Sequence, residues 1–386
     1  MRTVDASGLQ IGDDQPTRIM GVLNVSSESP YDPSVFDDPG EAATYVDEQL
    51  IDEGADIVDV GLESANKRFE VLTAEQELDR LETAVEAIAS VSGDAVFSIE
   101  TRYHEVAREA LNRGFEMVND ICGFADPKMP RVCEAYDVAV AKMASPPDLH
   151  RPGALEAVDD IYDALFRNGL TEKTIVDPAF GGWSEEKTLE DDRETLRRLR
   201  EFRAIGQPIL VSINRKNFLR ELAGRDTEDA LPVSLAATSM AVERGAHIVR
   251  THDVAATRDA AIVGDAFTPQ RVSDSAGEIT VEELTVSTRA EARRHFERIG
   301  TQDTPPTGYP DEIADGALAG LFELSGLSED QRRLLRTAGR ETGVVVEGHS
   351  PVILGGSIEN FARLAEDVES SPQLFRIITA IVEGYR

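Results

Sequence analysis

Charged and amide side chains stand at the ends of short apolar runs in the first two thirds of the sequence. The earlier runs end in acids and amides, which are Asn24, Asp59, Glu63, Glu100, Asn119, Asp120 and Asp177. The last two end mainly in cations, with Asn214, Arg215, Lys216, Arg250, His252 and Asp253. Acceptors on one side and cations on the other suit a ligand with a hydrogen-bonding ring at one end and an anion at the other.

Single residues of this kind also have structural explanations. Asp59 lies inside its apolar run, where it could satisfy neighbouring backbone, and Asp120 and Asp253 could cap the helices that follow them. The sorting of acids from cations is harder to explain in that way. We therefore predict that Lys216, with Arg250 and His252, forms a locally positive pocket in an otherwise acidic protein.

Eight runs rich in Val, Ile, Leu and Ala alternate with amphipathic segments. They cover residues 17–24, 55–62, 95–101, 116–121, 138–143, 174–180, 208–214 and 246–252. Such continuous apolar runs are typical of parallel strands buried on both faces. Gly54, Gly114 and Gly245 come just before three of the runs, where a helix must end in a left-handed turn. The pattern predicts an α/β fold, a (βα)₈ TIM barrel whose chemistry gathers at the carboxyl ends of the strands.

The composition changes after the eighth unit. We predict a barrel domain over residues 1–267, a polar, turn-rich linker over 268–278 and a small α/β accessory domain over 279–386. Within the last segment, ITVEELTVS reads as a strand, TRAEARRHFERIG as a helix and SPVILGGS as a buried apolar run.

The charge of the chain excludes several classes of partner. Its 386 residues include 72 Asp and Glu against 39 Lys and Arg, for a net charge of −33. So negative a protein is a poor partner for nucleic acid or an anionic membrane surface. The acids are dispersed over many helices, as in proteins of salt-loving microbes. We interpret the charge as an adaptation to solvent.

Other familiar motifs are missing from the sequence. It has no phosphate-binding G-x-x-x-x-G-K-[ST] loop and no G-x-S-x-G motif, and His104 lacks the second histidine of a zinc-protease helix, so we expect it on the surface. Cys122 and Cys133 have neither metal nor disulfide spacing. No apolar run approaches the roughly 20 residues of a membrane span. With no signal-like N-terminus, the sequence predicts a cytoplasmic protein.

Five segments, in order, resemble the dihydropteroate synthases among the pterin-binding barrels. They are IMGVLNVSSES, ADIVDVGLES, VNDICG, VDPAFG and the pair NRKNF and RTHDV, spread over about residues 17–267. The resemblance implies condensation of 6-hydroxymethyl-7,8-dihydropterin pyrophosphate with p-aminobenzoate, with Mg²⁺, and a possible homodimer.

The resemblance also implies roles for the residues at the strand ends. Asp177, Asn119 and Glu100 would hold the pterin ring, with Lys216 on its carbonyl. Arg250 and His252 would hold the pyrophosphate, and Asn24 would lie near the magnesium. Lys216, Arg250 and His252 would thus form the catalytic set. The residues of the acceptor loop are Ser64, Lys67 and Arg68.

The sequence departs from the family pattern at the acceptor side. The loop that usually reads Glu-Ser-Thr-Arg-Pro-Gly is Glu-Ser-Ala-Asn-Lys-Arg over 63–68, and Glu100 replaces an aspartate. Lys67 or Arg68 could stand in for the missing arginine. These departures leave three alternatives open: a modified aminobenzene acceptor, a methyl-pterin enzyme, or a pterin-binding paralogue without catalysis. The cation cluster counts against the methyl-pterin enzyme.

Overall fold

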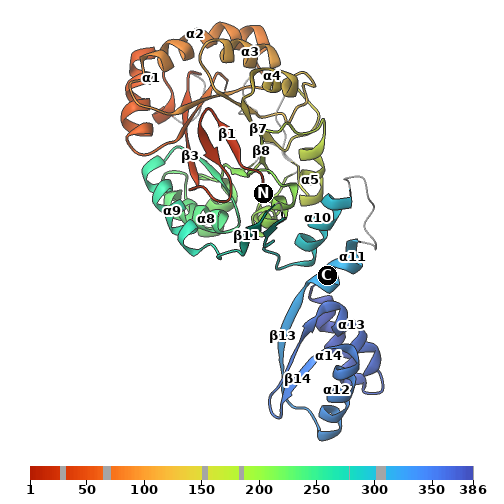
Figure 1. Ribbon diagram of the computed structural model, residues 1–386. Helices are drawn as coiled ribbons and strands as arrows, with labels where there is room; N and C mark the ends of the chain where they lie inside the picture. The colour runs from red at the N-terminus through yellow and green to blue at the C-terminus, as the bar shows by residue number, and fades with distance from the viewer. Residues whose placement is uncertain are drawn as a thin grey trace. The chain divides into compact units, whose positions relative to one another are not determined.

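The computed structural model describes residues 1–26, 32–63, 71–149, 155–181, 187–277, 279–300 and 310–385. The chain divides into two compact units, Met1–Pro269 and Gln270–Arg386. In the first unit, helices form a ring around a central group of strands (Figure 1). No helix of the described residues is both long and apolar enough to cross a bilayer.

Eight parallel strands form the sheet of the first unit. They are β3 (Arg18–Asn24), β4 (Ile57–Gly61), β5 (Val96–Glu100), β6 (Met117–Asp120), β7 (Ala139–Met143), β8 (Thr174–Asp177), β9 (Leu210–Val211) and β10 (Ile248–Thr251). Their order is β8-β7-β6-β5-β4-β3-β10-β9, and a bridge between Val176 and Ile209 joins the two edges. The predicted (βα)₈ barrel is confirmed, and each strand lies inside its predicted apolar run.

Helices connect the strands on the outside of the barrel. In chain order, the helical segments are η1 (Asp32–Ser34), α1 (Pro39–Tyr45), η2 (Val46–Ile51), α2 (Ala74–Ser90), α3 (His104–Asn112), α4 (Met129–Tyr136), α5 (Val158–Phe166), α6 (Leu189–Arg197), η3 (Leu199–Ile205), α7 (Asn217–Ala223), η4 (Glu228–Ala230), α8 (Leu231–Glu243) and α9 (Val254–Phe267). Gly54, Gly114 and Gly245 have φ of 103°, 109° and 102°, as expected of glycines that end helices in a left-handed turn.

A short N-terminal hairpin closes the barrel at the amino ends of its strands. Strands β1 (Val4–Ala6) and β2 (Leu9–Ile11) pair antiparallel. Val4, Ala6 and Ile11 share a buried cluster with residues at or near the amino ends of the barrel strands, such as Met20 and Ile57. The polar strand-end residues therefore lie at the opposite, carboxyl end. The sequence interpretation missed this hairpin.

The second unit has its own core and begins inside the predicted linker. Strand β11 (Ser273–Ala276) pairs with β12 (Ile279–Glu282), so the segment 268–278 is not wholly irregular. The other elements are α10 (Arg289–Gly300), α11 (Pro310–Ala317), β13 (Ala319–Leu324), α12 (Glu329–Thr342), β14 (Val345–Gly348), β15 (Val352–Ser357), α13 (Ile358–Asp367) and α14 (Pro372–Glu383). Its antiparallel sheet has the order β13-β15-β14, and helices α12, α13 and α14 contribute to the core.

Candidate active site

Four barrel strands bring their polar residues together at the carboxyl end. The guanidinium of Arg250 on β10 donates from Nε to Asp59 Oδ2 at 2.7 Å and from Nη2 to Glu100 Oε2 at 2.6 Å. Asn119 on β6 donates from Nδ2 to the same Asp59 oxygen at 2.9 Å. Asp59 is fully buried, so it acts as the shared acceptor that fixes Arg250 and Asn119. Arg250, Glu100 and Asn119 thus lie together around Asp59.

Asp177 and Lys216 form the next part of the site. Asp177 ends β8, where its Oδ1 accepts a hydrogen bond from the backbone N–H of Ala179 at 2.8 Å. Lys216 reaches past Gly181: a Cβ at that glycine would lie 3.0 Å from Lys216 Nζ. Gly181 also has φ of +114°, which other residues rarely adopt. The glycine therefore gives the lysine its space beside the end of β8.

A second lysine supports this turn, and the sequence interpretation missed it. Lys187 donates from Nζ to the carbonyl of Ala179 at 2.8 Å and lies 3.1 Å from Asp192 Oδ1. The same Asp192 oxygen accepts from the Gly181 N–H at 3.2 Å. Thr188 and Asp191 form a capping box that starts α6, so the sequence carried a signal that Lys187 directly precedes a helix.

The neighbouring cations Arg215 and Lys216 have different tasks. Arg215 donates from Nε and Nη2 to the two oxygens of Asp253, at 2.8 and 2.9 Å, and from Nη1 to the carbonyls of Thr227 and Glu228. It thereby ties the loop after β9 to the loop after β10. Its φ of 51° is left-handed, and of these two neighbouring cations it is Lys216 whose charge acts on Asp177. Asp253 is a partner of Arg215 and makes no side-chain cap on α9.

Burial shifts the pKa values of several of these groups towards neutral pH. It raises the pKa of Asp177 to about 6, although Lys216 and Arg250 oppose the shift. Burial also raises the pKa of Glu100 to about 7, against the effect of Arg250 and with a further rise from Asp59. Burial and the charge of Arg250 lower the pKa of Lys216 to about 8. Proton occupancy in this site therefore changes between pH 6 and 8.

His252 differs from the sequence expectation in its charge. It follows β10, but burial and then Arg250 lower its pKa to about 3, so the imidazole is neutral at physiological pH. The expected group of three cations is thus two cations and a neutral ring. A neutral histidine can still donate one N–H to an anion.

Asn24 offers an oxygen of the kind that magnesium prefers. Its Nδ2 donates to Ser34 Oγ at 2.9 Å, which fixes the amide. A Cβ at Gly61 would lie 3.0 Å from Asn24 Oδ1 and 3.9 Å from Glu100 Oε1, so both oxygens flank this glycine. Amide and carboxylate oxygens suit Mg²⁺, whose remaining positions are usually taken by water and phosphate oxygens. The donor chemistry therefore fits the predicted metal.

Other predicted residues lie elsewhere in the barrel or outside the described residues. The acceptor-loop residues Ser64, Lys67 and Arg68 lie outside the described residues. Asp120 accepts from the N–H groups of Cys122 and Phe124 at 2.8 and 2.9 Å, so it holds the turn after β6. The expectation that His104 is a surface residue is wrong. It is 5% exposed, because its Nδ1 lies 2.7 Å from Asp126 Oδ2 and draws the ring inward.

Comparison with known proteins identifies the relatives of this barrel. The family model described as "Pterin binding enzyme" matches residues 20–252, which include the strand-end residues named above except Asp253. The chain belongs to this pterin-binding enzyme family. Within the family, the dihydropteroate synthase of Bacillus subtilis is 30% identical over 246 residues, which cover 62% of this chain and 85% of that protein.

Two further relatives show the extent of the match. The Halobacterium salinarum protein named "Probable bifunctional folylpolyglutamate synthase/dihydropteroate synthase" is 33% identical over 250 residues, and the match covers 62% of this chain but only 30% of that protein. The structure of Thermus thermophilus dihydropteroate synthase in complex with 4-aminobenzoate has a TM-score of 0.57 and 31% identity, and the match covers 69% of this chain and 100% of that chain. The family resemblance thus concerns the barrel.

Proposed function

We propose that this protein is a dihydropteroate synthase. It would join 6-hydroxymethyl-7,8-dihydropterin pyrophosphate to p-aminobenzoate, releasing pyrophosphate and forming 7,8-dihydropteroate. The observation that carries the proposal is the pairing, at one end of a pterin-family barrel, of the buried acceptor Asp177 with the cations Lys216 and Arg250. That pairing matches a ring with N–H donors and a diphosphate tail on one substrate.

The ring end would be held by acceptors and one donor. The aminopyrimidinone edge of a pterin presents adjacent N–H groups, which the carboxylate of Asp177 can accept as a pair. Asn119, fixed by Asp59, would add an amide contact, and Glu100 lies on the neighbouring strand. Lys216 would donate to the ring carbonyl. The family resemblance supports each of these roles.

The pyrophosphate end would be held by Arg250 and His252. Nε and Nη2 of Arg250 bind Asp59 and Glu100, and its Nη1 has no hydrogen-bond partner among the described residues, so it can donate to a phosphate oxygen. The neutral ring of His252 would contribute one N–H. Magnesium, when bound near Asn24, would balance part of the charge on the leaving group.

The chain can support this reaction without a covalent nucleophile. The bond between the methylene carbon and the pyrophosphate oxygen breaks, and the pterin ring stabilises the resulting cation. The aryl amine then forms the carbon–nitrogen bond and loses a proton. The contribution of the protein is to place the two substrates and to stabilise negative charge on the pyrophosphate. Each donor of this kind contributes about 3–4 kcal/mol at most to the barrier.

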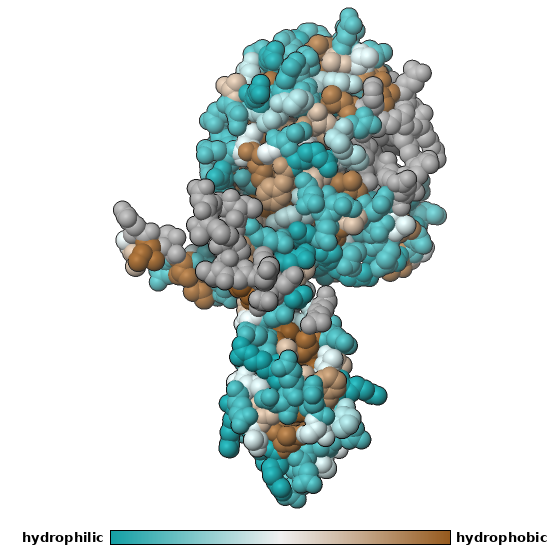
Figure 2. Space-filling view, turned by 90° about the vertical axis from the view of Figure 1, so that its right-hand side faces the viewer, coloured by the Kyte–Doolittle hydropathy of each residue, from teal (hydrophilic) through white to brown (hydrophobic). Residues whose placement is uncertain are grey.

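Two properties of the intact protein are also part of the proposal. We infer that it works in the cytoplasm at high salt, since hydrophilic residues cover most of the face shown in Figure 2 outside the grey residues, and the net charge is −33. Both buried cysteines are free thiols, which suits a reducing compartment.

We further infer a homodimer through the outer sides of α8 and α9. These two helices pack side by side, and four large apolar side chains on them are exposed: Met240, Ile262, Val263 and Phe267. A second copy would bury them, as oligomer interfaces usually do. Light scattering in high salt should give twice the chain mass of 42.1 kDa, and a mass of one chain would contradict the dimer.

The acceptor side gives a prediction based on sequence alone. If Lys67 or Arg68 pairs with the carboxylate of p-aminobenzoate, changing both to alanine should raise the KM for this amine. One charge-assisted contact is worth about 1–3 kcal/mol, which corresponds to roughly a 5- to 150-fold increase. Binding of the dihydropterin, measured by calorimetry, should stay nearly constant. An unaltered KM would show that both residues are solvated loop residues.

The assay that tests the function follows pyrophosphate release in high salt. It uses dihydropterin pyrophosphate with p-aminobenzoate and, in parallel, with a ribosylated aminobenzene. Release that depends on p-aminobenzoate supports the proposal. Release only with the ribosylated amine would identify a synthase with a modified acceptor. Pterin binding with no release from any amine would favour a binding paralogue without catalysis, a reading favoured by the altered loop at 63–68.

A further inference from the structure

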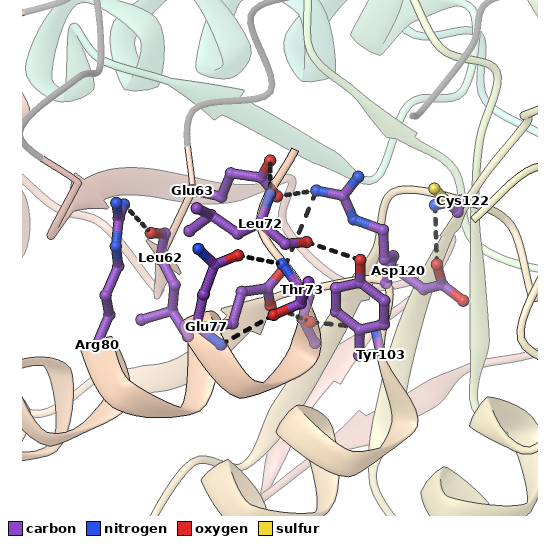
Figure 3. A network of polar contacts seen from close by, with 12 residues as sticks. Leu62, Glu63, Leu72, Thr73, Glu77, Arg80, Tyr103, Asp120 and Cys122 are labelled. Atoms are coloured by element: carbon purple, nitrogen blue, oxygen red, sulfur yellow. Dashed lines mark hydrogen bonds and ion pairs between the residues drawn. The ribbon is translucent and has the colours of Figure 1, made fainter. Parts of the chain in front are cut away.

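A buried arginine ties together the elements around the second barrel loop. Arg102 follows β5 by two residues and is 1% exposed, although arginine is almost never fully buried unless it is paired. Its Nη2 donates to Glu63 Oε2 and lies 3.9 Å from Glu77 Oε1 (Figure 3). Glu63 comes directly after β4 and its neighbour Leu62, whereas Glu77 is in the first turn of α2. One guanidinium thus connects three elements of the barrel.

Glu63 holds both ends of the connection between β4 and α2. While its Oε2 binds Arg102, its Oε1 accepts the backbone N–H of Leu72 at 3.0 Å. The carbonyl of Leu72 accepts from the hydroxyl of Tyr103 at 2.7 Å. Figure 3 shows these contacts converging from β4, α2 and the turn after β5. The two chain ends that flank residues 64–70 are therefore fixed to each other and to the turn that carries Arg102.

The network is close to electrically neutral. Thr101 Oγ1 donates to Glu77 Oε2 at 2.6 Å. Burial raises the pKa of Glu77 to about 8, so this acid is mostly protonated at pH 7. The positive charge of Arg102 is then balanced mainly by Glu63. A buried ion pair is tolerated only with such close, hydrogen-bonded partners, and removing one partner leaves a costly unpaired charge.

The same turn reaches the substrate-binding end of the barrel. Thr101 stands between Glu100 and Arg102, and its N–H donates to the carbonyl of Asn119 at 3.1 Å. Glu100 binds Arg250 in the candidate active site. The position of Arg102 is therefore fixed by the strands that would hold the pterin. Arg102 in turn fixes Glu63, which binds the backbone at Leu72, so both ends of the β4–α2 connection are held.

We propose that Arg102 is a positioning residue for the aryl-amine acceptor. Its ion pair with Glu63 fixes the ends of the connection whose residues contact the amine in the function proposed above, on which this inference rests. Arginine suits this task because its rigid, planar guanidinium holds Nη2 in a fixed position beside Glu63 and Glu77, whereas the ammonium of lysine sits on a flexible stem. Arg102 does not touch the substrates itself.

The test compares steady-state kinetics for three variants. In Arg102→Gln, and in the double variant Arg102→Gln/Glu63→Gln, we expect the KM for p-aminobenzoate to rise roughly tenfold, the effect of losing about one charge-assisted contact. The KM for dihydropterin pyrophosphate should change less than about twofold. The double variant removes both charges together, so it should fold even if the single variant does not. Arg102→Lys should recover only part of the acceptor affinity.

Glu77→Gln is the matched control in the same network. Glutamine mimics the protonated acid that Glu77 carries at pH 7, so this variant should keep both KM values. A purely structural role for Arg102 would lower the amount of active enzyme and leave both KM values unchanged, and that result would overturn the inference. If the wild-type protein turned over no aryl amine, the proposed function would fail first. If the folded double variant turned over the amine with an unaltered acceptor KM, the positioning role of Arg102 would be wrong, and the proposed function would stand.

Discussion

Replacing Asp177 with asparagine should weaken dihydropterin binding by roughly 30- to 1000-fold. The change turns one accepting oxygen into an N–H₂ donor that faces the N–H groups of the ring. A mismatch of this kind at a charge-assisted pair costs on the order of 2–4 kcal/mol. Calorimetry with 6-hydroxymethyl-7,8-dihydropterin measures the loss directly. Asp163→Asn, on the exposed side of α5, is the control and should bind like the wild type.

The pH dependence of binding should disappear in the same variant. The carboxyl of Asp177 has a pKa of about 6 and must be ionised to accept two N–H groups. Wild-type affinity should therefore fall as the pH drops through 6, by up to tenfold per pH unit below it, and the Asn variant should lack this component. Equal affinity and equal pH profiles for the two proteins would remove Asp177 from the site.

The fold should survive this substitution. Because the folded-state pKa of Asp177 lies above its ordinary value of 3.8, the folded protein binds more protons than the unfolded chain between about pH 4 and 6. The contribution of Asp177 to stability is present below pH 4 and is lost as the pH rises through 6. At pH 7.5 the asparagine variant should consequently melt no lower than the wild type.

Removing Arg250 should discriminate between two pterin ligands. Arg250→Ala should weaken the pyrophosphorylated pterin by roughly 10- to 100-fold, since hydrogen bonds to charged groups contribute about 1.5–3 kcal/mol. The loss for the bare alcohol should be only a few-fold, whereas Lys216→Ala, which removes the donor to the ring carbonyl, should weaken both ligands alike. Competition binding with both ligands measures the two losses on the same protein sample. Arg131→Ala, at an exposed cation on α4, should affect neither ligand.

The ratio of the two losses matters because Arg250 also has a structural role. Its removal leaves Asp59 and Glu100 without their buried partner, so some general destabilisation is expected. Destabilisation weakens both ligands alike and cancels in the ratio. Equal losses for the alcohol and the pyrophosphate would contradict the phosphate assignment and revive an enzyme that uses a methyl-pterin.

The barrel could be predicted because parallel strands buried on both faces leave continuous apolar runs. Each of the eight strands lies within its run, whereas the hairpin β1–β2 was missed because its strands have only three residues each. The strand-end acids and cations were found for the same reason, since the topology alone gathers the ends of parallel strands.

The parts of the site that escaped prediction depend on burial and local backbone conformation. The neutrality of His252 arises from desolvation, which its sequence neighbours do not reveal. Arg215 binds Asp253 whereas Lys216 lies near Asp177, and this difference depends on a left-handed φ at Arg215. Arg102 resembles a surface loop residue in the sequence, and only the fold brings Glu63 and Glu77 to it from separate elements.

The central claim is that a pterin methylene carbon is transferred from pyrophosphate to an aryl amine. The direct measurement uses dihydropterin pyrophosphate labelled with ¹⁸O at the oxygen that joins the methylene carbon to phosphorus, together with p-aminobenzoate in high salt. Mass spectrometry should find all of the label in pyrophosphate and one dihydropteroate formed per pyrophosphate released. Label retained in hydroxymethyl-dihydropterin, or pyrophosphate released without a condensed product, would contradict the account.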